Sequence, residues 1–210
     1  MLSPLTALRR LRDRRDDSGV TLIELLVSMI VFSIVMGAAY GVLLQIQMQT
    51  KDTVGRADAV AQAKLAVAQM DRQVRSGNVL YDPAGEAALG FPMSMRIYTQ
   101  ANAEEKCVQW QILNGVLRMR SWSPNWQSDG AVSSWITAAR DIGNQSSVSA
   151  DTPFSLSGTA TPYSARVVNI LLRVKNPNSN GHRYDVQTSL AGRNTVYGYD
   201  TSTCSPIPPA

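Results

Sequence analysis

The chain has 210 residues, a formal net charge of +4, one histidine and two cysteines. A charge this small does not favour a nucleic-acid-binding protein, which needs a clustered basic face. The histidine and cysteines form no cluster with metal-ligand spacing, and the glycines form no phosphate-binding loop. We therefore expect no enzyme activity, no cofactor and no metal, although scattered carboxylates leave calcium open: Asp82, Glu86, Asp185 and Asp200.

A short basic leader, residues 1–19, precedes a long apolar run. The leader holds five arginines and three aspartates, and the twenty residues from Leu25 to Leu44 carry no charge. A helix of that length rises about 30 Å, enough to cross a bilayer core. Because the positive flank of a spanning helix stays in the cytoplasm, we expect everything after Leu44 to lie outside it.

A cleaved secretory signal peptide is the alternative explanation of this run. Such a peptide has an apolar core of about 7–15 residues, followed closely by a small-residue cleavage site. The uncharged run is longer, and its nearest Ala-x-Ala candidate, Ala57-Asp58-Ala59, lies more than ten residues beyond its end. The sequence therefore favours a retained spanning helix.

One carboxylate, Glu24, stands at the start of the apolar run. A carboxylate in hydrocarbon costs roughly 2.5–3.5 kcal/mol on the lenient insertion scale, so it normally has a partner or a task. The alternative is a glutamate that only extends to the edge of the membrane.

Gly19, followed by Val20-Thr21-Leu22-Ile23-Glu24-Leu25-Leu26, resembles the cleavage and methylation signature of type IV prepilins and type II secretion pseudopilins. The resemblance implies that a prepilin peptidase cuts between Gly19 and Val20 and methylates the new amino terminus at Val20. It implies that Glu24 guides the subunit into a filament. It also implies three other kinds of partner: other pilins or pseudopilins, an inner-membrane assembly platform and membrane lipid. That family most often begins its mature chain with phenylalanine, and this chain has valine.

The chemistry of the residues explains why the motif contains a glycine at the cut and a glutamate one helical turn later. Glycine has no side chain, so a protease can approach its backbone closely. The cut creates a positive α-amino group at Val20, about one helical turn from Glu24. That amine, or a neighbour's, could neutralise the glutamate in low dielectric and fix the register between subunits.

We expect one helix from Val20 to Ser76, because residues 51–76 hold many strong helix formers, no proline and one glycine. Its halves would be a membrane and assembly half (20–44) and an amphipathic half (45–76). The Gly77-Asn78 pair predicts the stop, with glycine able to adopt a left-handed cap.

Each half of this helix carries a stripe of similar residues along one face. In the outer half Val60, Val67 and Val74 recur every seven residues, with Ala63 and Met70 between them, and we expect this stripe to pack on a globular domain rather than a coiled-coil partner. In the membrane half the small residues recur every four positions: Ser33, Gly37 and Gly41. Such a face allows close helix packing in lipid, although small residues are also common in spanning helices generally.

Residues 77–210 predict a β-rich domain, which with the helix gives an α+β, pilin-like fold. Asn114-Gly115 stands between two alternating runs and predicts a hairpin. Further strands are expected at Met93–Tyr98, Arg166–Val174 and Arg183–Leu190, the last two as a second hairpin. Residues 121–162 read as long and irregular, with three tryptophans expected to anchor the core: Trp122, Trp126 and Trp135.

Cys107 and Cys204 both lie on the expected outer side, where two cysteines suggest one disulfide. It would contribute about 4–5 kcal/mol by closing a long loop. Free thiols are the alternative.

The outer domain extends the resemblance to minor pilins of the J-type pseudopilin and W-type pilin group. The similar features are Cys107-x-x-Trp110, Leu117-x-x-Arg120, a long strand around Ile170 and the stretch Thr188–Asn194. These features imply a membrane-stored subunit that enters, starts or caps a type IV pilus or a secretion filament.

Two other functions stay open: a binding module at a filament tip for adhesion or DNA uptake, and a plain membrane-anchored domain whose Gly19 is never cut. Without the leader the net charge is +2, so nucleic-acid binding is not favoured but stays open.

Overall fold

The computed structural model describes residues 19–157, 167–178, 182–193, 200 and 202–209. The chain forms two compact units, Met1–Gln49 and Thr50–Ala210. The predicted leader (1–18), Asn194 and the stretch 158–166 lie outside the described residues, so the structure does not address the predictions made for them.

Helix α2 (Leu22–Ser76) is unbroken over 55 residues. It begins two residues after the predicted start and ends where the sequence predicts. The stop itself differs from the expectation, because Gly77 takes no left-handed conformation and instead begins strand β1 (Gly77–Leu80). A Cβ at Gly77 would lie 2.9 Å from Cγ2 of Ile97, so glycine is needed there for close packing.

Five antiparallel strands follow in the order β1-β2-β3-β4-β5. Their bounds are β2 (Ser94–Thr99), β3 (Lys106–Leu113), β4 (Val116–Trp122) and β5 (Ile136–Ala139). The predicted hairpin joins β3 to β4, and its turn residues Asn114 and Gly115 have φ of 51° and 76°. Two consecutive positive φ values define a type I′ turn, whose twist matches that of the strands.

A second sheet has three strands in the order β6-β7-β8. Its strands are β6 (Phe154–Leu156), β7 (Val167–Lys175) and β8 (Arg183–Ala191), and β7 pairs with β8 as the sequence predicts. Short helices complete the domain: α3 (Pro83–Glu86), α4 (Trp126–Asp129), η1 (Ala87–Leu89), η2 (Ala101–Ala103) and η3 (Ser149–Asp151). The segment expected to be irregular therefore contains α4, β5, η3 and β6, so that expectation was wrong in part.

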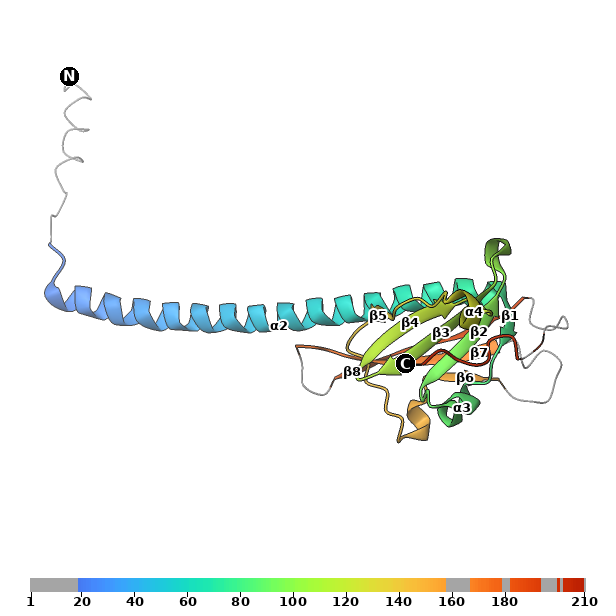
Figure 1. Cartoon of the computed structure of the whole chain (residues 1–210). Coiled ribbons are helices and arrows are strands. Elements are labelled where there is room, and N and C mark those ends of the chain that lie inside the picture. Colours follow the sequence, from blue (N-terminus) through green and yellow to red (C-terminus); the bar gives the residue numbers. More distant parts are fainter. Residues whose placement is uncertain (1–18, 158–166, 179–181, 194–199, 201, 210) are drawn as a thin grey trace, which may run out of the picture. The chain divides into compact units, whose positions relative to one another are not determined.

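The main core joins the outer half of α2 to both sheets (Figure 1). The helix contributes mainly small side chains, which leave room for the large ones of the sheets; the buried helix residues are Ala59, Ala63, Ala66, Met70 and Val74. Val60 and Val67 of the predicted stripe are only partly buried at the edge of this core. Trp110, at 0% exposure, is the sheet's anchor against the helix, and its indole nitrogen donates to Oε1 of Gln73 at 2.6 Å.

The opposite face of the five-stranded sheet carries a smaller cluster built around the disulfide. Cys107 of β3 and Cys204 are bonded across 97 residues of sequence, with their Cα atoms 5.7 Å apart, which confirms the predicted pair. Val79, Tyr98 and Trp122 surround them. Of the tryptophans expected in the core, Trp122 is buried, whereas Trp126 and Trp135 are only half-buried.

Candidate assembly site

Gly19 and Val20 precede α2 as exposed, non-helical residues. A Cβ added at Gly19 would meet no atom within 4 Å. Within the described part of the chain both residues flanking this bond are therefore exposed, as a peptidase substrate requires.

Thr21 caps the helix that follows. Its carbonyl oxygen accepts from the backbone N–H of Leu25 at 3.2 Å, and its Oγ1 accepts from the backbone N–H of Glu24 at 3.4 Å. A threonine at the N-cap followed three residues later by glutamate is the spacing of a capping box, and the structure shows its threonine half, in which the hydroxyl oxygen accepts from the N–H of the third helical residue.

The Thr-x-x-Glu spacing assigns the Glu24 carboxylate a capping role that the sequence interpretation did not consider. The Thr-x-x-Glu spacing before an apolar run would have been enough to recognise it. A carboxylate in the first turn also interacts favourably with the helix dipole. Capping and assembly are therefore separate roles that a test at Glu24 has to distinguish.

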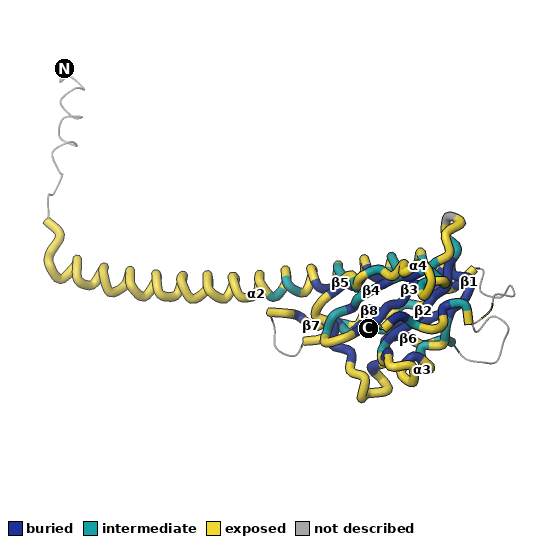
Figure 2. The backbone as a smooth tube through the Cα atoms, viewed as in Figure 1, coloured by how far each residue is buried: buried dark blue, intermediate teal, exposed yellow. Residues whose placement is uncertain are grey.

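Every residue from Gly19 to Lys51 is exposed (Figure 2). The apolar side chains of this stretch cover all sides of the helix, and α2 is long and apolar enough to cross a membrane by length and composition. A helix that is hydrophobic all round needs an apolar environment, either lipid or other helices.

The small-residue face is open. Adding a Cβ at Gly37 or Gly41 would meet no atom within 4 Å, and the hydroxyl of Ser33 donates to the carbonyl oxygen of Met29 at 2.7 Å. Ser33 therefore satisfies its own polar group, and the three residues leave a shallow strip on which another helix could lie closely.

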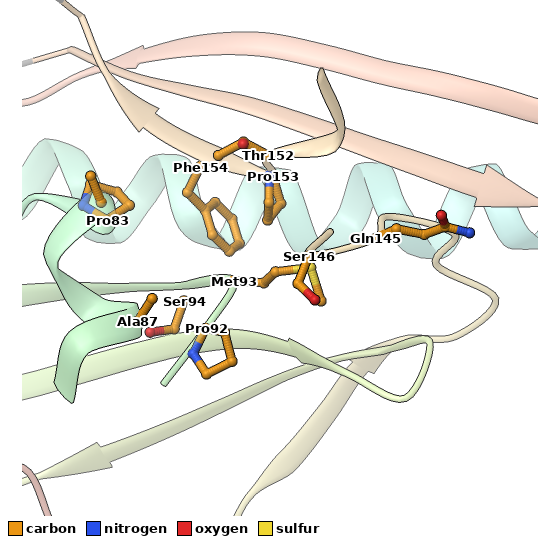
Figure 3. A pocket seen from close by; sticks show the side chains of 11 residues that line it. Pro83, Ala87, Pro92, Met93, Ser94, Gln145, Ser146, Thr152, Pro153 and Phe154 are labelled. Atoms are coloured by element: carbon orange, nitrogen blue, oxygen red, sulfur yellow. The ribbon is translucent and has the colours of Figure 1, made fainter. Parts of the chain in front are cut away.

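The outer domain contains a cavity of about 180 Å³ beside α3 and the starts of β2 and β6. Pro83, Met93 and Phe154 supply much of its apolar wall, and Ser94 is among its polar residues (Figure 3). Among the described residues its lining includes hydroxyl and amide groups, from Ser94, Ser146, Thr152 and Gln145, but no histidine, carboxylate or thiol.

Within the described ranges, no group of three or more His, Cys, Asp or Glu residues is placed to hold a metal ion. Of the carboxylates considered for calcium, Glu86 is buried against Arg96, with Oε1 2.8 Å from Nε of the arginine. Burial raises the pKa of Glu86, and Arg96 opposes that shift. His182 is exposed on the approach to β8.

Comparison with known families identifies one match. Residues 14–40 match the prokaryotic N-terminal methylation motif, a stretch that contains Gly19, Val20, Glu24, Ser33 and Gly37. No curated protein and no solved structure matches the chain.

The match and the fold agree. A long amino-terminal helix followed by a small antiparallel sheet domain is the α+β layout of the pilin fold. Proteins of that kind are structural rather than catalytic, and the motif implies processing by prepilin peptidase and assembly with other pilins. The chain carries a prokaryotic N-terminal methylation motif across the start of α2, and this motif supports a type IV pilin-like protein anchored in a membrane.

Proposed function

We propose that the chain is a minor pilin or pseudopilin, stored in the cytoplasmic membrane and then incorporated into, initiating or capping a type IV pilus or a type II secretion-like filament. The methylation motif on a fully exposed apolar helix carries this proposal. Such a helix can exchange lipid for the helices of neighbouring subunits, because both environments are apolar.

In the proposed sequence of events, prepilin peptidase cuts between Gly19 and Val20 and methylates Val20. The new ammonium group then pairs with the Glu24 carboxylate of a neighbouring subunit, and the pair is satisfied in low dielectric. The small strip at Ser33, Gly37 and Gly41 packs against another helix. An inner-membrane assembly platform supplies the subunit to the filament.

The minor-subunit assignment rests on the outer domain. Cys107 and Trp110 lie on β3, Leu117 and Arg120 lie on β4, and Ile170 lies on the long strand β7. Part of the Thr188–Asn194 stretch lies in β8, whereas Asn194 is outside the described residues. The resemblance to the J-type and W-type group is thus carried mainly by a disulfide-pinned hairpin, and it supports a role at the start or end of a filament.

Mass spectrometry of the amino terminus tests the proposal directly. The full chain is produced in a membrane with and without a prepilin peptidase. We expect the peptidase to yield a chain that begins at Val20 and carries one added methyl group. Gly19→Val should block the cut, because it places a branched side chain where the protease must approach the backbone.

Val20→Ala serves as the matched control on the other side of the bond and should still be cut. A full chain that keeps residues 1–19 in the presence of an active peptidase would instead support a plain membrane-anchored domain. A processed chain that never enters sheared filaments would contradict the subunit role.

A further inference from the structure

The face of the five-stranded sheet that points away from α2 has unusual chemistry for a sheet surface. Strand alternation sends Leu117 and Met119 of β4 toward the main core and sends Arg118, Arg120 and Trp122 the other way. Arg120 is only 2% exposed and Trp122 is 2% exposed. Something must cover them.

The cover is the tail segment, residues 202–209. Cys204 fixes its start through the disulfide to Cys107 of β3. The backbone N–H of Cys204 donates to the hydroxyl of Tyr81 at 3.1 Å, and its carbonyl accepts from Nη1 of Arg96 at 3.0 Å.

Beyond Cys204 the tail is held through its carbonyl groups. The indole N–H of Trp126 donates to the carbonyl of Pro206 at 2.8 Å. The two terminal nitrogens of Arg120 donate to the carbonyls of Pro208 and Pro209, each at 2.7 Å. Pro208 is buried and Ile207 is half-buried against the disulfide cluster.

Residues outside the tail hold the Arg120 side chain in place. Its Nε donates to Oε1 of Gln109 at 2.9 Å, which orients the guanidinium, and its Cζ lies 4.5 Å from the ring centroid of Trp135 and 5.4 Å from that of Trp122. Burial lowers the pKa of Arg120 to about 10, so the group is still a cation at neutral pH. A buried cation needs acceptors, and in the described part of the chain the tail carbonyls supply two of them.

The tail suits such a site because three of its residues are prolines: Pro206, Pro208 and Pro209. Proline has no N–H, so these positions can only accept hydrogen bonds, and its fixed φ limits the entropy lost on binding. Indole and guanidinium donors supply the complementary hydrogen bonds, and aromatic-lined surfaces are a known way of recognising proline-rich peptides.

We propose that Arg120, Trp122, Trp126 and Trp135 form a binding site for a proline-rich peptide, which the chain's own tail occupies and which the tail of a second copy can enter. This site, called the proline site below, lies wholly within the outer domain. It is therefore independent of the subunit role proposed above.

A second copy is the occupant that the contacts favour. Each copy carries both the site and a segment that fits it, so an exchange can be reciprocal. After Cys204 the described tail is attached by three hydrogen bonds, by buried Pro208 and by half-buried Ile207, and none of these contacts involves the disulfide bond itself, so this segment can leave while the disulfide stays closed.

Peptide binding to a shortened chain tests the site. The full chain in detergent is compared with a variant that ends at Ser205 and keeps both cysteines. The probe is a fluorescently labelled synthetic peptide of residues 205–210, followed by anisotropy. We expect saturable binding to the shortened chain and at least tenfold weaker binding to the full chain, because a tethered tail competes at an effective concentration of about 1 mM.

Two variants of the shortened chain assign the contact. Arg120→Gln should weaken peptide binding at least tenfold, and Trp126→Phe should weaken it severalfold without burying a new polar group. Arg75→Gln is the matched control, because the Arg75 guanidinium pairs with Asp71 on α2 rather than with the tail or the rings of the site. No peptide binding, equal binding by a peptide with its prolines replaced by alanine, or no effect of Trp126→Phe would overturn the proline site.

Co-purification tests the second copy. A tagged shortened chain should retain more untagged full chain than untagged shortened chain, since only the full chain carries a tail to donate. Equal retention of the two would refute the exchange between copies.

Discussion

The two parts of α2 place the same backbone in opposite chemical situations. From Leu22 to Gln49 every residue is exposed and apolar residues occur on all sides, whereas from Thr50 to Ser76 one face is buried and the rest is mostly polar. The buried face is built from alanines with one methionine and one valine, because it must fit closely against two sheets. The exposed part is built mainly from larger aliphatic residues, and no other element of the described chain covers it. In α2, small side chains therefore mark the part that packs within the chain, and larger side chains mark the part that is left for an external partner.

Of the changes considered, removing the carboxylate of Glu24 from the exposed part of α2 should have the largest effect, and the effect is on incorporation into filaments. We expect Glu24→Val to reduce incorporation into filaments by about a hundredfold or more, because breaking a buried ion pair costs about 3–5 kcal/mol. The measurement is the amount of subunit in sheared filaments relative to the amount in membranes.

Glu24→Gln separates the two roles of this residue. Glutamine can keep the capping-box geometry with Thr21 but carries no charge. If charge fixes the register, Glu24→Gln should fail as Glu24→Val does. Normal incorporation of the glutamine variant would show that capping is enough.

A matched pair of methionines tests the difference between the two parts. Met70 is 0% exposed and Met36 is 53% exposed. Met70→Ala should lower the free energy of unfolding of the outer domain by about 2–5 kcal/mol, through lost burial and a cavity.

Met36→Ala should leave that free energy unchanged. Urea unfolding in detergent, followed by tryptophan fluorescence, reports on the outer domain alone, because all four tryptophans lie after residue 76. Equal losses for the two variants would contradict the division of α2 into an internally and an externally partnered part.

The sequence predicted the features that depend on local chemistry. The Asn114-Gly115 turn and the β7-β8 hairpin follow from turn residues and periodicity, whereas the end of α2 was predicted at the right residue but from a glycine cap that does not form. Strands β5 and β6 were missed because they have four and three residues, and only pairing with β4 and β7 makes them strands. Such short segments carry too little pattern to be recognised alone.

The candidate sites likewise separate into one that local sequence predicts and one that depends on residues far apart in the chain. The motif around Gly19, Val20 and Glu24 is contiguous in sequence and could be found there, although its capping box was overlooked. The contacts of Arg120 with the tail join residues 88 and 89 positions apart, so no local pattern predicts them.

The small strip of the exposed part should give a moderate effect. Gly41→Leu is expected to lower incorporation into filaments about tenfold, equivalent to about 1.4 kcal/mol, because a leucine keeps another helix from close approach. Leucine is apolar, so insertion into the membrane should be unchanged. Ala39→Leu is the control on the opposite side of the helix and should be neutral, and a larger defect for Ala39→Leu would move the packing face away from the strip.

The smallest expected effect is on the stability of the outer domain, from a change in α2 near the start of its buried face. Asn176 Nδ2 donates to the carbonyl of Asp52 at 3.1 Å, and Asn178 Nδ2 donates to that of Lys51 at 2.9 Å. These amides reach the helix backbone because Gly55 has no side chain, and a Cβ there would overlap the amide of Asn178.

Gly55→Ala should therefore destabilise the outer domain by about 1 kcal/mol, since two lost hydrogen bonds outweigh the gain in helix propensity. Gly37→Ala has no neighbour to displace and should leave tryptophan-detected unfolding unchanged. The opposite result, a gain in stability for Gly55→Ala, would mean that helix propensity outweighs the asparagine contacts. In that case the internal partner of α2 would begin only at Ala59, where its buried residues start.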